Sequence, residues 1–121
     1  MSNIGFIFVF AGVIFNALGQ IALKSGALMI LKPDTANSYF EIFKSAINFP
    51  IFLGLVFYVV SVSLWIVALT KVPVSIAYPM LSIGYVIVTI LGYYLYNEPI
   101  TIYKLSGLAI IIFGVILISR A

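Results

Sequence analysis

This chain of 121 residues is 64% hydrophobic and only 7% charged, whereas a water-soluble domain carries about 25% charged residues, so the composition excludes an ordinary soluble protein. It has no cysteine and no histidine, which excludes disulfides, zinc sites and a histidine base. We interpret the net charge of +3 as positive-inside topology with contact to anionic membrane lipids, and not as nucleic-acid binding.

The hydrophobic pattern predicts an all-α membrane protein with a single four-helix transmembrane domain over residues 1–121. The four transmembrane helices are expected at about 4–31, 51–70, 74–96 and 102–119. A short amphipathic helix is expected between the first and the second. We predict no enzyme activity, no cofactor and no metal site.

The first helix, 4–31, carries two adjoining stripes. Glycines recur at intervals of seven residues and form a stripe where another helix can come close. These glycines are Gly5, Gly12, Gly19 and Gly26. Beside them, Asn16, Gln20 and Lys24 follow one another at intervals of four. Taken one at a time, the two amides are typical of interhelical hydrogen bonds, and the lysine is typical of a side chain that reaches the membrane interface. Because all three share one face, we favour the interpretation that they line a polar cavity.

The one long connection, 32–50, is predicted to begin with a turn at 32–34 and to contain a short helix. Ser38 and Glu41 have the spacing of a capping box that opens this helix, and Pro50 is expected to end it. Its apolar face consists of Tyr39, Phe40, Ile42, Phe43, Ala46 and Ile47. The helix is too short to span a bilayer, so we expect it to lie in the interface as a lipid anchor; the alternative is a gate over the cavity.

The second helix, 51–70, places Tyr58, Ser61 and Trp65 on one face. Trp65 lies near a helix end, where an indole commonly anchors a protein at the membrane interface. Because it shares a face with Tyr58 and Ser61, lining of the cavity is an equal alternative.

The third helix, 74–96, carries no charge but has a polar stripe at spacings of three and four residues. The stripe consists of Ser75, Tyr78, Ser82, Tyr85 and Thr89. Polar groups are costly against lipid, so the stripe is expected to face other helices or a wet cavity. Pro79 removes one backbone hydrogen bond inside this helix, which predicts a kink and a place where the backbone meets a ligand.

The segment Asn97-Glu98-Pro99 closes the third helix. We interpret Glu98 as a helix cap or as a partner for Lys104. The last helix, 102–119, has two glycines seven residues apart but no polar stripe. We therefore assign it to packing against another subunit.

Several stretches bear a likeness to a known family: G-Q-I-A-L-K in the first helix, V-P-V-S-I-A-Y-P-M-L-S in the third, the N-E-P after it, and G-L-A-I-I-I-F-G-V-I-L-I in the last. The chain resembles the small multidrug resistance proteins of the drug/metabolite transporter superfamily. Within it, the chain is most similar to the EamA-like subunits of the aminoarabinose-phosphoundecaprenol flippase. The resemblance implies a homodimer, or a heterodimer with a paralogue, in the inner membrane of a prokaryote.

The main departure from the multidrug exporters is Asn16. At the matching position those exporters have a membrane-embedded glutamate that binds cation and proton in turn, and an amide can do neither. The acids of the chain, Asp34, Glu41 and Glu98, all fall in loops or at helix ends. No carboxylate is therefore placed to drive antiport at the bilayer midplane.

We therefore expect a flippase that moves a polyprenyl-phosphate-linked sugar, of the undecaprenyl phosphate type, between the leaflets. Its partners would be this lipid-linked sugar and membrane lipids, with Lys24 as the cation for the phosphate. The predicted binding set is Asn16, Gln20, Lys24, Tyr58, Ser61, Trp65, Ser75, Tyr78, Pro79, Ser82 and Tyr85. The alternatives are a multidrug-type exporter of small cations or metabolites, and a non-transporting subunit of a glycosyltransferase system.

Overall fold

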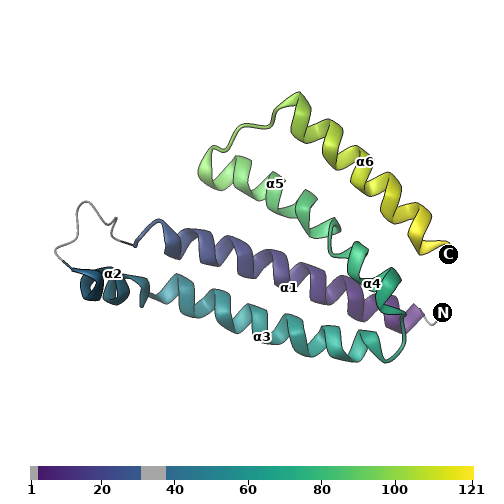
Figure 1. Cartoon of the computed structure of the whole chain (residues 1–121), viewed down its shortest axis with the longest axis horizontal. Coiled ribbons are helices and arrows are strands. Elements are labelled where there is room, and N and C mark those ends of the chain that lie inside the picture. The colour runs from purple at the N-terminus through teal and green to yellow at the C-terminus, as the bar shows by residue number, and fades with distance from the viewer. Residues whose placement is uncertain (1–2, 31–37) are drawn as a thin grey trace.

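The computed structural model describes residues 3–30 and 38–121, and over those residues the chain forms helices and connections without a strand. The helices, in chain order, are α1 Asn3–Ala27, α2 Tyr39–Ala46, α3 Phe49–Leu69, α4 Val74–Met80, α5 Ile83–Tyr96 and α6 Ile102–Ser119 (Figure 1). Four spans are long and apolar enough to cross a membrane: α1, α3, α4 together with α5, and α6. The predicted all-α membrane fold is confirmed. The turn predicted at 32–34 lies outside the described residues.

α1 and α3 lie side by side along most of their length (Figure 1). The glycine stripe of α1 is buried, as predicted, with Gly12, Gly19 and Gly26 against α3 and Gly5 against the turn that follows α3. A Cβ added at Gly19 would lie 3.2 Å from the carbonyl oxygen of Gly54, and one added at Gly54 would lie 3.0 Å from the carbonyl oxygen of Gly19. The two backbones therefore approach more closely than side chains would allow, which is how small residues hold membrane helices together.

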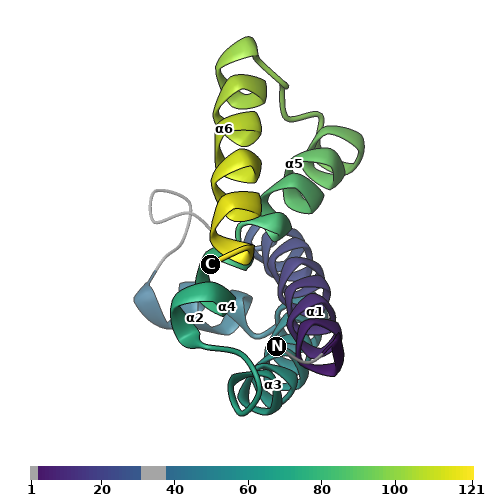
Figure 2. The same cartoon turned by 90° about the vertical axis from the view of Figure 1, so that its right-hand side faces the viewer.

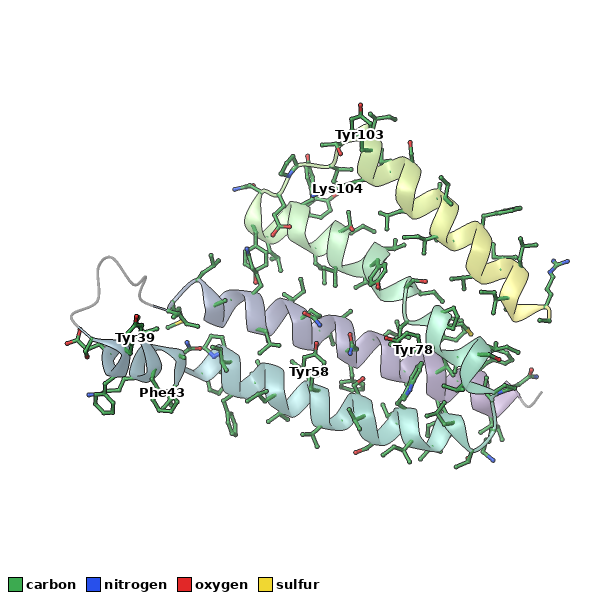
Figure 3. The ribbon with its side chains drawn as sticks, viewed as in Figure 1. Tyr39, Phe43, Tyr58, Tyr78, Tyr103 and Lys104 are labelled. Carbon is green, nitrogen blue, oxygen red and sulfur yellow. The ribbon has the colours of Figure 1, made fainter. Side chains whose placement is uncertain are left out.

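The short helix α2 begins as predicted, because the side-chain oxygen of Ser38 accepts a hydrogen bond from the Glu41 N–H at 3.3 Å. None of its residues is buried. Figure 3 shows Tyr39 and Phe43 on this helix, at the end of the molecule, and the two residues are 88% and 63% exposed. Among the described residues this apolar face stays largely exposed, which suits a helix lying in the membrane interface.

The boundaries around α2 differ from those predicted. α1 ends at Ala27 instead of near residue 31, and α3 begins at Phe49 with Pro50 in its first turn. The prediction that Pro50 ends α2 is wrong. Asn48 caps α3 instead, with its Oδ1 accepting from the Ile51 N–H at 3.0 Å. A proline fits the first turn of a helix because its missing N–H would have no partner there.

The third predicted span is interrupted near Pro79, where the sequence predicts a kink. α4 ends at Met80 and α5 begins at Ile83, with a tight turn between them. Pro79 has no N–H to donate back to the preceding turn. Its carbonyl accepts from both the N–H of Ser82 and the hydroxyl of Ser82. The hydroxyl of Ser82 thus finds its own hydrogen-bond acceptor in the backbone at the break, as a polar group among membrane helices must.

α6 stands apart from the other helices and touches them mainly near its C-terminal end (Figure 2). Only Val115 of this helix is buried, in a core cluster that also contains Val9, Val72 and Met80. Most of the remaining surface of α6 is apolar and exposed, which is costly in water but not in lipid. A Cβ at Gly107 or Gly114 would meet nothing within 4 Å.

Candidate substrate groove

The polar face of α1 lines a hollow between α1 and α5. Its volume is about 430 Å³, and its lining residues are Asn16, Ala17, Gln20, Leu81, Gly84, Tyr85 and Val88. Gly84 is buried, and a Cβ there would lie 3.5 Å from Val13. α5 thus rests close on α1 at this point while space remains beside Asn16 and Gln20. Residues of two predicted polar stripes, one on each helix, meet here.

A second hollow, of about 310 Å³, lies between α6 and the broken span of α4 and α5. Its lining residues are Tyr78, Pro79, Leu81, Ser82, Tyr85, Ile111, Gly114, Val115 and Ile118. It adjoins the first hollow, because both include Leu81 and Tyr85. Tyr78 and Tyr85 are 66% and 57% exposed. This part of the site is therefore open at its side, where lipid would surround the helices.

Two further hollows, of about 160 and 370 Å³, flank the C-terminal ends of α1 and α5. Both include Lys24, Tyr96 and Glu98. The smaller one also shares Gln20 and Val88 with the hollow between α1 and α5. Three of the hollows lie along the seam of α1 and α5, and the hollow beside α6 shares Leu81 and Tyr85 with one of them. We call the four neighbouring hollows together the α1/α5 groove.

The groove contains a pair of opposite charges. Lys24 Nζ lies 3.8 Å from Glu98 Oε1, and the two side chains are 45% and 44% exposed. The interpretation of Glu98 as a partner for Lys104 is wrong, because Lys104 Nζ instead donates to the carbonyl of Pro99 at 2.8 Å. Asn97 has left-handed backbone angles (φ 55°), and this turn sends the Glu98 side chain back toward α1.

Tyr96 ties the end of α5 to α1. Its hydroxyl donates to the carbonyl of Ile21 at 2.9 Å, and it also forms a hydrogen bond with the hydroxyl of Ser25. Neither Tyr96 nor Glu98 belongs to the predicted binding set. Tyr96 lies seven residues after Thr89 and so continues the polar stripe of the third span, which is a signal in the sequence. The pairing of Glu98 with α1 has no such local signal.

The predicted stripe of α3 faces α1 in the helix seam and does not line the groove. Tyr58 points from α3 toward α1 (Figure 3), where Gln20 Nε2 donates to its hydroxyl. Ser61 is 4% exposed, and its hydroxyl donates to the carbonyl of Gly12 at 2.8 Å. Trp65 packs against Gly12 and the core cluster. Ser61 and Trp65 lie in the seam because their face of α3 is the one that meets the α1 glycines.

The groove therefore brings together members of the predicted set from two of the membrane spans. They are Asn16, Gln20, Lys24, Tyr78, Pro79, Ser82 and Tyr85. Ser75 is exposed on α4. Among residues 3–30 and 38–121, no group of three or more His, Cys, Asp or Glu side chains could hold a metal ion. Chemically the groove offers amides, hydroxyls, aromatic rings and one pair of opposite charges.

Comparison with known proteins places the chain among transporters. The EamA-like transporter family matches residues 2–120. A probable 4-amino-4-deoxy-L-arabinose-phosphoundecaprenol flippase subunit ArnF from Erwinia tasmaniensis is 36% identical over 88% of this chain and 93% of its own length. The ArnF of Shewanella sediminis is 31% identical over 94% of this chain and 86% of its own length.

A second kind of flippase subunit matches part of the chain. The probable subunit ArnE of an Enterobacter species is 39% identical over 57% of this chain and 64% of its own length. No solved structure matches the chain with comparable significance.

Proposed function

Because the chain belongs to the EamA-like transporter family, we propose that it is a subunit of a flippase for a polyprenyl-phosphate-linked sugar. Relatives that match it over most of both chains are named as flippase subunits for an aminoarabinose-phosphoundecaprenol. The lipid carrier we propose is of the undecaprenyl phosphate type, and the membrane is the inner membrane of a prokaryote. In this role the protein is a transporter and not an enzyme.

The observation that carries the proposal is the α1/α5 groove. A lipid-linked sugar has a polar head, which must be hidden from hydrocarbon, and a tail that can stay in lipid. The groove runs from Lys24 past Asn16 and Gln20 to the side-open hollow beside α6. Its polar residues would bind the sugar head while the open side lets the tail remain among the lipids. We propose that Lys24 binds the phosphate.

The same residues argue against a multidrug-type exporter. The four membrane-spanning helices contain no Asp or Glu, and the position that carries glutamate in those exporters is Asn16. A buried carboxylate is what allows one site to exchange a proton for a cation. The groove is instead suited to a head group with an anionic phosphate, which an ammonium such as Lys24 attracts.

We further propose that the working unit contains two subunits. Relatives of this chain are named as two different subunits, ArnE and ArnF, which favours pairing with a paralogue, with a second copy of this chain as the alternative. α6 leaves most of its apolar surface uncovered. A partner packed there would enclose the side of the groove that a single chain leaves open.

Reconstitution into liposomes tests the proposed function. A polyprenyl phosphate carrying an amino sugar is placed in the inner leaflet, and a membrane-impermeant amine reagent then measures how much reaches the outer leaflet. Liposomes with this chain, alone or with a paralogous subunit, are expected to expose the amine faster than protein-free liposomes. Native mass spectrometry of the purified protein should show the same lipid bound. Equal exposure with and without protein, in both combinations, would contradict the proposal.

A further inference from the structure

Lys24 and Glu98 present a positive and a negative charge side by side within the groove. We infer that Glu98 binds the amine of an amino-sugar head group while Lys24 binds its phosphodiester, so that the pair opens to admit a zwitterion. Glu98 then determines specificity, because it selects an amino sugar over a neutral one. The inference rests on the proposed function and names the head-group chemistry that the groove prefers.

The backbone around Glu98 holds its carboxylate at the groove. After the left-handed Asn97, the N–H of Glu98 donates to the carbonyl of Gly92 at 3.2 Å. A Cβ added at Gly92 would lie 3.0 Å from Glu98 Oε2. The carboxylate therefore rests over the one residue of that turn with no side chain. This arrangement places the negative charge just after the end of α5, facing α1.

The pair is loose enough to be opened by a ligand. A distance of 3.8 Å between Lys24 Nζ and Glu98 Oε1 exceeds that of a hydrogen bond. Both side chains are also close to half exposed, and an ion pair with that much exposure contributes little to stability. Each charge thus keeps hydrogen-bonding capacity for a substrate group of opposite sign.

The surroundings of the pair suit a sugar carrying an amine on one side and a phosphate on the other. Hollows of about 160 and 370 Å³ lie against the pair, and Tyr96 lines both of them. The Tyr96 hydroxyl is held by α1, so its ring offers a fixed surface for the sugar. A zwitterionic head group would replace the Lys24–Glu98 pair with two ion pairs, Lys24 with the phosphate and Glu98 with the amine. A phosphate-linked sugar without an amine would leave Glu98 without an equivalent partner.

The chemistry of the named relatives agrees with this assignment. The lipid in their names carries an amino group on the sugar and a phosphate in the link to the polyprenol. Of the acids in this chain, Glu98 lines the groove next to Lys24, whereas Glu41 lies on α2. Glu41 therefore provides a matched control for removing one carboxylate.

The test uses two probes that differ at the amine: an amino-sugar polyprenyl phosphate and its N-acetylated form, which is larger by an acetyl group and carries no positive charge. The full-length protein is mixed with equal amounts of both, and native mass spectrometry measures the ratio bound. Wild type and Glu41→Gln are expected to prefer the amino sugar. Glu98→Gln is expected to lose roughly tenfold to a hundredfold in affinity for the amino sugar and less than about twofold for the acetylated form.

A charge exchange separates binding from a structural role. The double variant Lys24→Glu with Glu98→Lys keeps an ion pair with its charges exchanged. Because the polyprenyl tail determines which end of the head group carries the phosphate, the phosphate would then face Glu and the amine would face Lys. We expect the double variant to keep thermal stability and lose the amino-sugar preference. Recovery of that preference would overturn the inference, as would a bound ratio in Glu98→Gln equal to that of wild type. Wild type binding neither probe would count against the proposed function itself.

Discussion

The hydroxyl of Tyr96, at the end of α5, donates a hydrogen bond to the backbone carbonyl of Ile21 on α1 at 2.9 Å. This contact joins two spans that are far apart in the sequence, and it lies beside the Lys24–Glu98 pair in the groove. The wall of the groove on α5 is therefore held to α1 by a polar contact. Such contacts contribute modestly in membranes, because the separated helices also find other partners.

Tyr96→Phe is expected to weaken the attachment of α5 to α1. Removal of one such hydrogen bond costs about 0.5–1.5 kcal/mol, which should appear as a lower free energy of unfolding in mixed micelles. Tyr103→Phe is the control, since Tyr103 lies exposed near the start of α6 (Figure 3). Equal stability of the two variants would show that the Tyr96 hydroxyl contributes nothing to the fold.

Gly26→Ala is expected to disturb the seam of α1 and α3. The added Cβ would lie 2.8 Å from the backbone nitrogen of Ile51 and 2.7 Å from Asn48 Oδ1, and backbone cannot move aside as a flexible side chain can. Overpacking of this kind costs about 1–3 kcal/mol. Gly107→Ala is the matched control because a Cβ there meets nothing within 4 Å. In detergent, the unfolding temperature of Gly26→Ala should be clearly lower than that of Gly107→Ala. The reverse order would contradict the close packing of α1 on α3.

Lys24→Ala is expected to abolish translocation of the lipid-linked sugar while membrane insertion remains normal. Removing a charge-assisted hydrogen bond from a partly wet site costs about 1.5–3 kcal/mol, or roughly tenfold to a hundredfold in affinity. Lys24→Arg should keep part of the activity, since the charge survives with altered geometry, and Lys24→Gln should not. Lys104→Ala is the control, because Lys104 Nζ bonds to the Pro99 carbonyl. Lys24→Ala liposomes with activity within about twofold of wild type would remove the phosphate assignment.

Asn16→Glu is expected to impair transport of the lipid-linked sugar and not to create a cation exporter. The new carboxylate would line the hollow of about 430 Å³ between α1 and α5 and repel the phosphate of the head group. Asn16→Gln, which keeps an amide, is the control. Export of a fluorescent cation from proteoliposomes driven by a proton gradient is the measurement. Export by Asn16→Glu above the wild-type level would contradict this account of the groove.

Much of the fold follows from local patterns in the sequence. The long apolar runs predict four spans, and the structure has them. The spacing of the glycines predicts a close approach of two helices, which the structure has in the seam of α1 and α3. Ser38 and Pro79 act on their own neighbours, one as a cap and one as a helix breaker. Such features are predictable because backbone hydrogen bonding and helical periodicity depend on residues within a few positions.

The composition of the groove depends instead on which helix faces which. Periodicity places Tyr58, Ser61 and Trp65 on one face of a helix, but only the packing of α3 on α1 puts Ser61 and Trp65 in the seam and the hydroxyl of Tyr58 against Gln20. A polar stripe has the same period whether it meets a neighbouring helix or a cavity. The sequence therefore determines which residues share a face, and the tertiary structure decides what that face meets.

The pairing of Lys24 with Glu98 is the clearest case of what the tertiary structure alone decides. Sequence proximity favours Lys104 as the partner of Glu98. The left-handed turn at Asn97 and the return of α5 along α1 bring the carboxylate to Lys24 instead. Charges attract over several ångströms in any direction, so no local pattern selects between two lysines. The path of the backbone after α5 determines that Glu98 pairs with Lys24 and not with Lys104.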